Sequence, residues 1–220
     1  MRILAASDIH GNRSFYRGLP ESAKRLDADA IVLAGDLLGF PQPFKTVEEA
    51  QLADAEDILR LLEAIGLPVF YVMGNDDFVE LGSDNSRISS IHTRRIEAGG
   101  YNFVGYQYSL PFIGGIYEKS EEYIREDLAN IAGLMDRNTV FVTHSPAKGY
   151  LDKTALGSEA GSRSIRDVVN TRNPLVHIHG HIHECFGRIS PHFNVATDQS
   201  MRAMLIDLDT MRHRVIHLSI

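Results

Sequence analysis

The sequence predicts an α/β protein in which strands and helices alternate along the chain. Two observations lead to this prediction. Short apolar runs rich in β-forming residues are separated by stretches with helical periodicity, which favours a layered α/β fold over an all-α or all-β one. Five of these runs end directly in a polar motif, and ligands of α/β proteins gather beyond the carboxyl ends of strands. The motifs are therefore expected to share one edge of the molecule.

Helix signals fill the spaces between the first strand-like runs. Asn12 is a candidate N-cap, but Gly18 and Pro20 are expected to break the first helix. The clearest helix is predicted for residues 47–65, before a Gly-Leu-Pro sequence at 66–68 stops it. Its apolar positions recur at helical spacing and comprise Leu52, Ala55, Ile58, Leu59, Leu62 and Ile65.

Hairpin and loop signals organise the remainder of the chain. Gly99 and Gly100 predict a hairpin turn between two β-rich segments, and residues 120–134 read as a helix with Ser120 as its cap. The stretch 204–218 reads as a closing hairpin that turns at 209–210. Irregular loops, the first containing Pro41 and Pro43, are expected at 39–46, 78–92, 107–117 and 145–164.

The five strand-end motifs hold seven side chains that can ligate a metal ion. The strand-like runs are 3–6, 31–34, 69–73, 140–143 and 176–179, and the candidate ligands that follow them are Asp8, His10, Asp36, Asn75, His144, His181 and His183. Two pairs, 8/10 and 181/183, have a spacing of two, which in an extended segment points both side chains the same way. This nitrogen and oxygen set suits Mn, Fe, Co, Ni or Zn and lacks the thiolates of structural zinc sites.

The summed charge of the expected metal site indicates an anionic substrate. Two divalent cations would bring about +4; two ligand carboxylates and a bridging hydroxide would leave about +1, enough to attract a phosphate group locally. Water bound between such cations ionises near neutral pH and becomes the nucleophile. The expected chemistry is hydrolysis of a phosphoester.

The ordered motifs D-x-H, G-D, G-N-x-D, H and G-H-x-H resemble the calcineurin-like metallophosphoesterase superfamily, and its small bacterial and archaeal phosphoesterases in particular. The resemblance implies four layers, with two mixed β-sheets packed face to face and flanked by helices. It implies two divalent metal ions, for which manganese is favoured. One would be held by Asp8, His10, Asp36 and His183, and the other by Asp36, Asn75, His144 and His181.

One position departs from the family pattern. Many members have a histidine directly after the asparagine, where it is thought to protonate the leaving group; this chain has Asp76. Asn75 and Asp76 are the candidate catalytic residues, and the departure favours phosphodiesters over monoesters. Asp76 would act as an acid only with a raised pKa.

Asn12 is a candidate for substrate binding, with helix capping an equally good interpretation. Asp77 is expected to orient its loop.

Histidines outside the motifs are interpreted as structural. His92, His192, His213 and His217 have no motif context. His177 and His179 precede the glycine of the last motif and are assigned supporting roles within the strand, although a histidine-rich metal-binding tract is the alternative.

Composition narrows the class of protein. The 220 residues fit one domain spanning 1–220, and the net charge of −7 argues against nucleic-acid and membrane partners. Cys185 is the only cysteine, which excludes an intrachain disulfide and favours a reducing compartment. No signal-peptide pattern or apolar run of about 20 residues occurs. We expect a cytoplasmic protein acting on a small phosphoester, with a homo-oligomer left open.

Three alternatives compete with a phosphodiesterase. A phosphomonoesterase uses the same site. A non-catalytic scaffold of the same fold, like the retromer subunit, would not need all seven ligand positions filled, as they are here. A DNA-repair nuclease would carry DNA-binding segments, which this acidic chain lacks.

Overall fold

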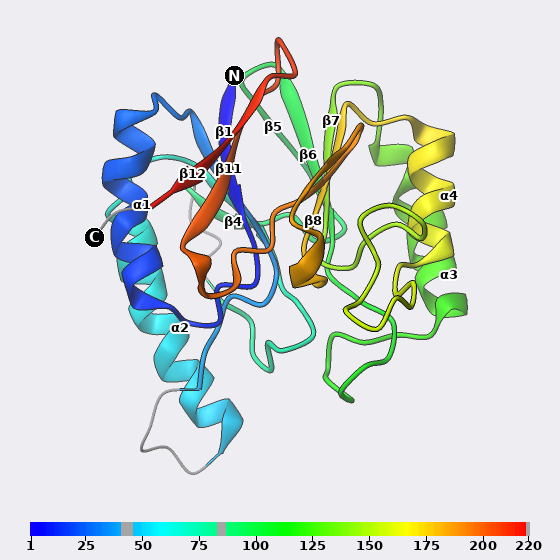
Figure 1. Ribbon diagram of the computed structural model, residues 1–220, viewed down its shortest axis with the longest axis horizontal. Helices are drawn as coiled ribbons and strands as arrows, with labels where there is room; N and C mark the ends of the chain where they lie inside the picture. The colour runs from blue at the N-terminus through cyan, green and yellow to red at the C-terminus, as the bar shows by residue number, and fades with distance from the viewer. Residues whose placement is uncertain (41–45, 83–86, 219–220) are drawn as a thin grey trace.

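A computed structural model describes residues 1–40, 46–82 and 87–218. Within this part of the chain, twelve strands form two six-stranded mixed sheets (Figure 1). In spatial order, the first sheet comprises β12 (His213–His217), β11 (Arg202–Asp207), β1 (Arg2–Ala6), β2 (Ala30–Ala34), β3 (Val69–Val72) and β4 (Ile88–Ser90). The second comprises β5 (Arg95–Ala98), β6 (Tyr101–Tyr106), β7 (Thr139–Thr143), β8 (Val176–His179), β10 (His192–Asn194) and β9 (Gly187–Ile189). Pro41 and Pro43, in the loop predicted for 39–46, lie outside the described residues, as does part of the loop predicted for 78–92.

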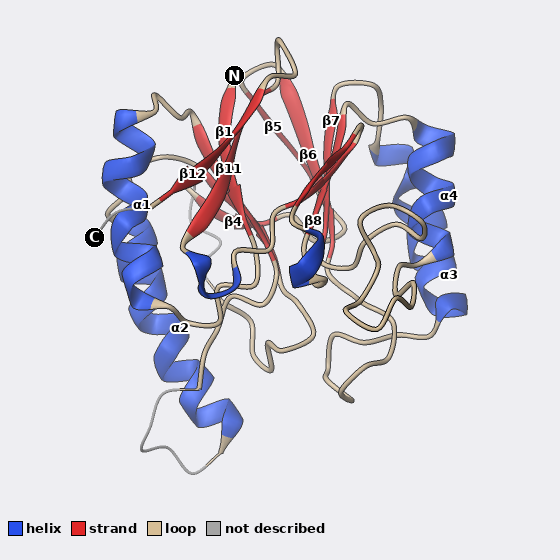
Figure 2. Ribbon diagram, in the orientation of Figure 1, coloured by secondary structure: helices blue, strands red, loops and turns tan. Residues whose placement is uncertain are grey.

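Helices cover the outer faces of both sheets, which completes the predicted four layers (Figure 2). The helices α1 (Arg13–Arg25) and α2 (Val47–Glu63) flank the first sheet. The helices α3 (Glu121–Ile131) and α4 (Arg163–Arg172) pack together on the second. None of the helices in the described residues is long and apolar enough to cross a membrane.

The alternation of strand side chains creates three separate apolar layers. On β1, Leu4 belongs to the cluster under α1 and α2, whereas Ile3 belongs to the cluster between the sheets. On β7, Phe141 faces α3 and α4, whereas Val140 packs between the sheets. Both faces of these central strands are buried, which is why they read as continuous apolar runs.

The first helix is not broken, contrary to the sequence-based expectation. It continues through Gly18 and Pro20 as one element of 13 residues. The lost hydrogen bond of a proline inside a helix costs about 3 kcal/mol, but buried Phe15, Leu19 and Ala23 fix the helix against the sheet. Burial of its apolar face outweighs the local preference.

The second helix confirms its predicted start but not every member of its apolar stripe. Thr46 caps its amino end by accepting a hydrogen bond from the Glu49 amide at 3.1 Å. Leu52 is 55% exposed, whereas the polar side chains of Gln51 and Asp54 are buried. The periodicity therefore located the helix correctly, but its buried face is rotated toward two polar residues.

The later elements are close to their predicted positions. Gly99 and Gly100 adopt positive φ angles of 59° and 85° and connect β5 to β6 as a hairpin. The helix predicted for 120–134 is α3 followed by a 3₁₀ turn (Ala132–Leu134), although the Ser120 side chain makes no capping bond. The closing hairpin of β11 and β12 is also present.

Candidate metal centre

The predicted motifs converge at the carboxyl edge of both sheets. All five parent strands run parallel to a neighbour within their own sheet: β1, β2 and β3 in the first sheet, and β7 and β8 in the second. Parallel strands present their carboxyl ends together. All seven candidate ligands consequently lie at this shared edge, which is the lower side of the strands in Figure 1.

The motif backbone is left-handed rather than extended. The φ angles are 55° at Asp8, 47° at His10, 52° at Asp36 and 70° at His181. The expectation that paired ligands share a side through extended geometry is therefore wrong. Sharp turns deliver the side chains instead, and such strained positions concentrate at functional sites.

Backbone hydrogen bonds lock the first two motifs together. The Asp8 amide donates to the Gly35 carbonyl at 2.9 Å, and the His10 amide donates to the Asp36 carbonyl at 3.0 Å. A β-carbon at Gly74 would overlap the Asp36 carboxylate, which explains the glycine of the third motif. The third motif can therefore approach Asp36 closely because Gly74 has no side chain.

One cluster joins Asp8, His10 and His183. The Nε2 atom of His183 lies 3.1 Å from Asp8 Oδ1, and one candidate ligand atom from each of the three residues lies within 4.8 Å of the others. Amides and hydroxyls hold the Asp8 carboxylate, which accepts hydrogen bonds from Ser7 Oγ and from the His181 amide. These residues belong to one of the two predicted ligand sets.

A second cluster joins Asp36, Asn75, His144 and His181. The Nε2 atom of His144 lies 2.9 Å from Asn75 Oδ1 and 3.3 Å from Asp36 Oδ2. The His144 and His181 ring centroids are 5.0 Å apart. The other ring nitrogen of His144 lies 2.9 Å from the Ala34 carbonyl, a contact typical of metal-ligating histidines.

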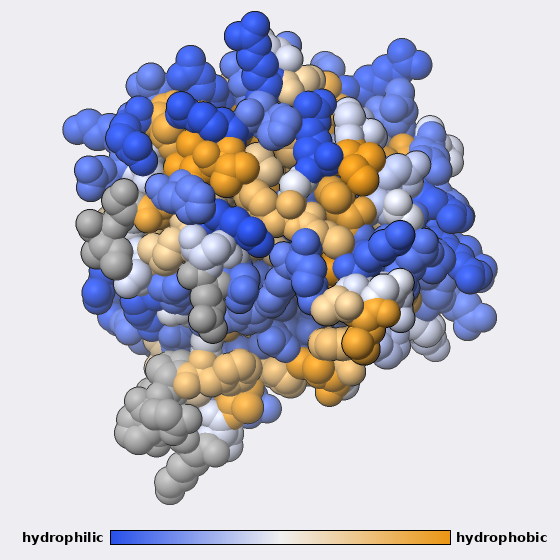
Figure 3. Space-filling view, viewed as in Figure 1, coloured by the Kyte–Doolittle hydropathy of each residue, from blue (hydrophilic) through white to orange (hydrophobic). Residues whose placement is uncertain are grey.

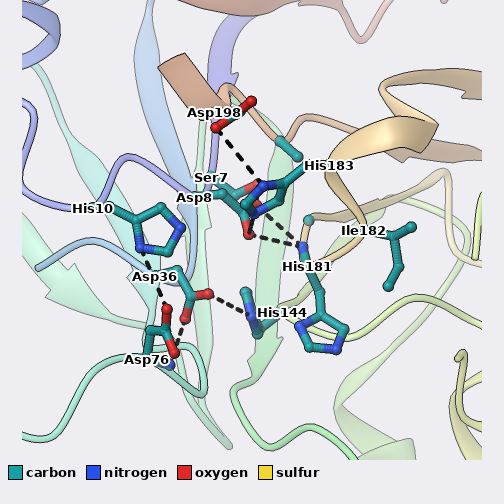
Figure 4. A network of polar contacts seen from close by, with 12 residues as sticks. Ser7, Asp8, His10, Asp36, Asp76, His144, His181, Ile182, His183 and Asp198 are labelled. Carbon is teal, nitrogen blue, oxygen red and sulfur yellow. Dashed lines mark hydrogen bonds and ion pairs between the residues drawn. The ribbon is translucent and has the colours of Figure 1, made fainter. Parts of the chain in front are cut away.

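Asp36, a member of the second cluster, also comes close to Asp8 and His10 of the first (Figure 4). It can share a metal ion with Asp8 and His144 on one side, and with His10 and Asp76 on the other. Its Oδ1 accepts a hydrogen bond from the Asp76 amide at 2.9 Å, while Oδ2 is the oxygen facing His144. This is the position that a carboxylate bridging two cations requires.

The buried charge at this edge favours cations. Asp8 and Asp36 are almost fully buried, and no ion pair joins either carboxylate to a lysine or arginine among residues 1–40, 46–82 and 87–218. Burial alone would lower the pKa of His144, but the Asp36 and Asp8 charges raise it to about 10. Buried carboxylates without a permanently charged partner are costly, so the donor set fits divalent metal ions.

The three remaining histidines of the site differ in their charge environment. The hydrogen bond to Asp8 raises the pKa of His183. Burial and the neighbouring His144 lower the pKa of His181 to about 4, which keeps its imidazole neutral and able to ligate. His10 is half-buried, and its Nδ1 lies 3.7 Å from Asp76 Oδ2.

Asp76 faces the cavity rather than the protein interior. Burial and the Asp36 charge raise its pKa, a shift that the sequence alone did not reveal. The neighbouring Asp77 has the predicted orienting position: its carboxylate accepts hydrogen bonds from the Leu37, Leu38 and Gly74 amides. It therefore ties the second motif to the third.

The other sequence candidates lie outside the cavity lining. Asn12 is the N-cap of α1, where its Oδ1 accepts hydrogen bonds from the Ser14 and Phe15 amides at 3.1 and 3.2 Å. His177 and His179 are fully buried in β8, and His177 stacks on Phe141 behind the site.

Three supporting residues were missed by sequence reasoning. Gln51 bonds the Asp76 carbonyl at 2.7 Å, and Asp54 accepts from the Gly39 amide at 2.7 Å. Asn194 donates to the Ile182 carbonyl at 2.9 Å. Gln51 and Asp54 lie on the same helix as the predicted apolar stripe of α2 and next to its members, which was the available signal. No motif in the sequence marks Asn194.

Five of the seven candidate ligands border a cavity of about 550 Å³. One wall comprises His10, Asp36, Asn75, Asp76, His181 and His183. The lining also includes Phe112, Ile182, Glu184 and five residues of the segment 154–160. This volume is within the usual range of about 300–1,000 Å³ for small-molecule sites.

Comparisons with known proteins identify the family and support the fold. The family model of calcineurin-like phosphoesterases matches residues 1–185. A structure from Thermus thermophilus is similar over 99% of both chains, with 19% identity and a TM-score of 0.74. A dimetal phosphatase from Danio rerio is similar over 100% of this chain and 99% of its own, with 13% identity and a TM-score of 0.60. No curated protein sequence matches the chain.

Proposed function

The chain belongs to the calcineurin-like phosphoesterase family and is a metallophosphoesterase, and from this premise we propose a dinuclear centre that hydrolyses small phosphodiesters. One cation is assigned to Asp8, His10, Asp36 and His183, and the other to Asp36, Asn75, His144 and His181. The observation that supports two cations is the position of Asp36, whose carboxylate can share a metal ion with Asp8 and His144 and also with His10 and Asp76. When bound, two such cations, with Mn²⁺ favoured, supply an ionised water nucleophile and stabilise phosphoryl charge.

The chain's own residues prepare this centre before substrate binds. The Ala34 carbonyl orients the His144 ring so that Nε2 faces Asn75 and Asp36. Ser7 and the His181 amide orient the Asp8 carboxylate. Ligands fixed in this way need little rearrangement during the reaction, which is the basis of electrostatic preorganisation.

The charge of the cavity supports diesters over monoesters. Asp76 and Glu184 line it together with the candidate ligands, and its described lining residues include no lysine or arginine. A phosphodiester carries one negative charge, whereas a monoester carries up to two near neutral pH. The additional charge of a monoester meets two carboxylates and no compensating side-chain cation.

The test is hydrolysis by purified protein loaded with Mn²⁺. We expect turnover of bis(4-nitrophenyl) phosphate to exceed that of 4-nitrophenyl phosphate, and a chelator to abolish both. Faster monoester turnover would overturn the diester preference. Metal binding without hydrolysis of either ester would favour the non-catalytic scaffold.

A further inference from the structure

The substrate cavity has one polar and one apolar wall. Beside the candidate ligands, the lining includes Phe112, Leu156 and Ile182, together with Ala155 and Ala160, which form its apolar wall. The ring of Phe112 meets the His181 ring edge-on, with centroids 5.7 Å apart. The apolar wall therefore begins directly beside the candidate metal ligands.

The side chains of this wall are unusually exposed. Leu156 is 94% exposed and Phe112 is 73% exposed, and Ile113 and Ile116 on the same loop are about half exposed. Figure 3 shows apolar side chains gathered over the loops at the lower right of the molecule. A contiguous exposed apolar surface beside a reactive centre marks a binding surface.

Both loops are held in shape by their own hydrogen bonds. The Glu118 carboxylate accepts from the amides of Phe112, Ile113 and Gly114 at 2.8–3.0 Å. In the other loop, the Thr154 amide donates to the Ser158 carbonyl at 2.9 Å, and Leu156 lies at the tip of that turn. The loops thus present Phe112 and Leu156 as preorganised contacts.

The charge of the lining limits what these contacts can bind. Asp76 and Glu184 are its acidic members outside the proposed ligands, and a nucleoside polyphosphate or a nucleic-acid strand would bring further phosphates toward them. The described lining residues include no lysine or arginine that could form an ion pair with such phosphates. An uncharged organic group meets no such repulsion.

We infer that this site selects phosphodiesters in which one ester group is an alkyl chain, and that this chain lies against Phe112 and Leu156. The inference rests on the proposed function, because the phosphate is positioned by the proposed metal centre. Each methylene buried against the wall contributes up to about a fourfold gain in kcat/KM.

The experiment uses a series of 4-nitrophenyl alkyl phosphates with methyl, butyl, hexyl and octyl chains, all below their micellar concentrations. For the Mn²⁺-loaded protein we expect kcat/KM to rise with chain length. Leu156→Ser and Phe112→Ser should each reduce the octyl-to-methyl ratio by about fivefold or more. Leu52→Ser removes an exposed leucine outside the cavity lining and should leave that ratio unchanged.

A second readout does not depend on turnover. Octylphosphonate should bind the Mn²⁺-loaded protein at least tenfold more tightly than methylphosphonate in calorimetry, and Leu156→Ser should reduce that difference. Hydrolysis of all four esters with equal kcat/KM would overturn the inference and leave the proposed function intact. Absence of any hydrolysis would instead overturn the proposed function.

Two other outcomes would assign the apolar wall to a different occupant. A rate that rises only above the micellar concentration would indicate a lipid surface. A dimer that dissociates on Leu156→Ser substitution, with an unchanged octyl-to-methyl ratio, would indicate a second copy of this chain. Either result would contradict an ester subsite.

Discussion

At the residue scale, both halves of the proposed metal centre depend on Asp36. Its carboxylate can share a metal ion with Asp8 and His144 and also with His10 and Asp76, and the proposed assignment gives it to both cations, whereas it gives His10 to one. Asp36→Asn should therefore lower kcat/KM more than His10→Ala at saturating Mn²⁺, and by more than the roughly 10–100-fold typical of losing an outer-shell partner. Steady-state kinetics with metal analysis of both variants tests this. Equal residual activities would argue against a shared carboxylate.

Asp76 allows a second prediction at this scale. Its pKa is raised by burial and by Asp36, yet two bound cations would favour its charged form. Asp76→Ala should therefore leave diester hydrolysis within a few-fold of wild type. General acid catalysis typically contributes about 10²–10⁴-fold, so a loss of that size on esters with poor leaving groups would identify Asp76 as the acid.

The converse substitution tests the departure from the family pattern. Asp76→His should raise monoester turnover, because it removes one negative charge from the cavity and introduces the usual donor. Metal content must be measured alongside, since Asp76 lies near His10 and Asp36. An unchanged monoester rate at unchanged metal content would assign substrate choice to the loops.

Residue types were readable from the sequence, but backbone conformation was not. All seven candidate ligands followed from apolar runs that end in polar motifs. The left-handed angles at Asp8, His10, Asp36 and His181 did not, because they arise from hydrogen bonds between motifs far apart in the chain. Local spacing cannot reveal a turn whose stabilising partners lie elsewhere.

At the element scale, the sequence located helices better than it oriented them. The stripe of α2 included Leu52, which is exposed, and omitted Gln51 and Asp54, which bond the site loops. Pro20 was expected to break α1, but packing against the sheet retains it. For both helices, packing against the rest of the fold determined the outcome, and helix propensity alone did not predict it.

The contact between α3 and α4 yields an element-scale prediction. Glu121 accepts hydrogen bonds from Ser162 Oγ and the Ser164 amide, both at 2.8 Å, so a residue of α3 caps α4. Glu121→Ala should lower the free energy of unfolding by roughly 2 kcal/mol, because buried donors lose a charged acceptor. Urea denaturation measures it. Glu122→Ala, at an exposed site on the same turn, is the control, and equal losses would contradict the cap.

At the scale of the whole molecule, the layers of sheets and helices bury titratable side chains as well as apolar ones. The alternation of strands and helices predicted the α/β class, and the family resemblance implied four layers. The order of strands was not readable: β1 pairs with β11, about 200 residues later, and no local signal encodes that pairing. The same layering buries His177 of β8 together with His192, a residue whose burial no motif in the sequence indicated.

These histidines predict how stability depends on pH. Burial lowers the pKa of His192 to about 4, and burial with the neighbouring His179 and His192 lowers that of His177. The unfolded chain, with an ordinary histidine pKa near 6.5, binds more protons than the folded one between these values. Stability should therefore fall as pH decreases from about 6.5 toward 4.

His192→Phe tests this dependence directly. The ring stacks on Tyr150, with centroids 4.1 Å apart, so phenylalanine preserves the shape of the contact while removing the titrating group. His177 loses its 2.9 Å contact with His192, so the variant should be less stable at pH 8, where both histidines are neutral. Between pH 7 and 5, however, its Tm should fall by about 2–4 °C less than that of wild type, equivalent to roughly 1 kcal/mol. Calorimetric Tm profiles of the two proteins that run parallel over this range would show that His192 does not couple folding to protons.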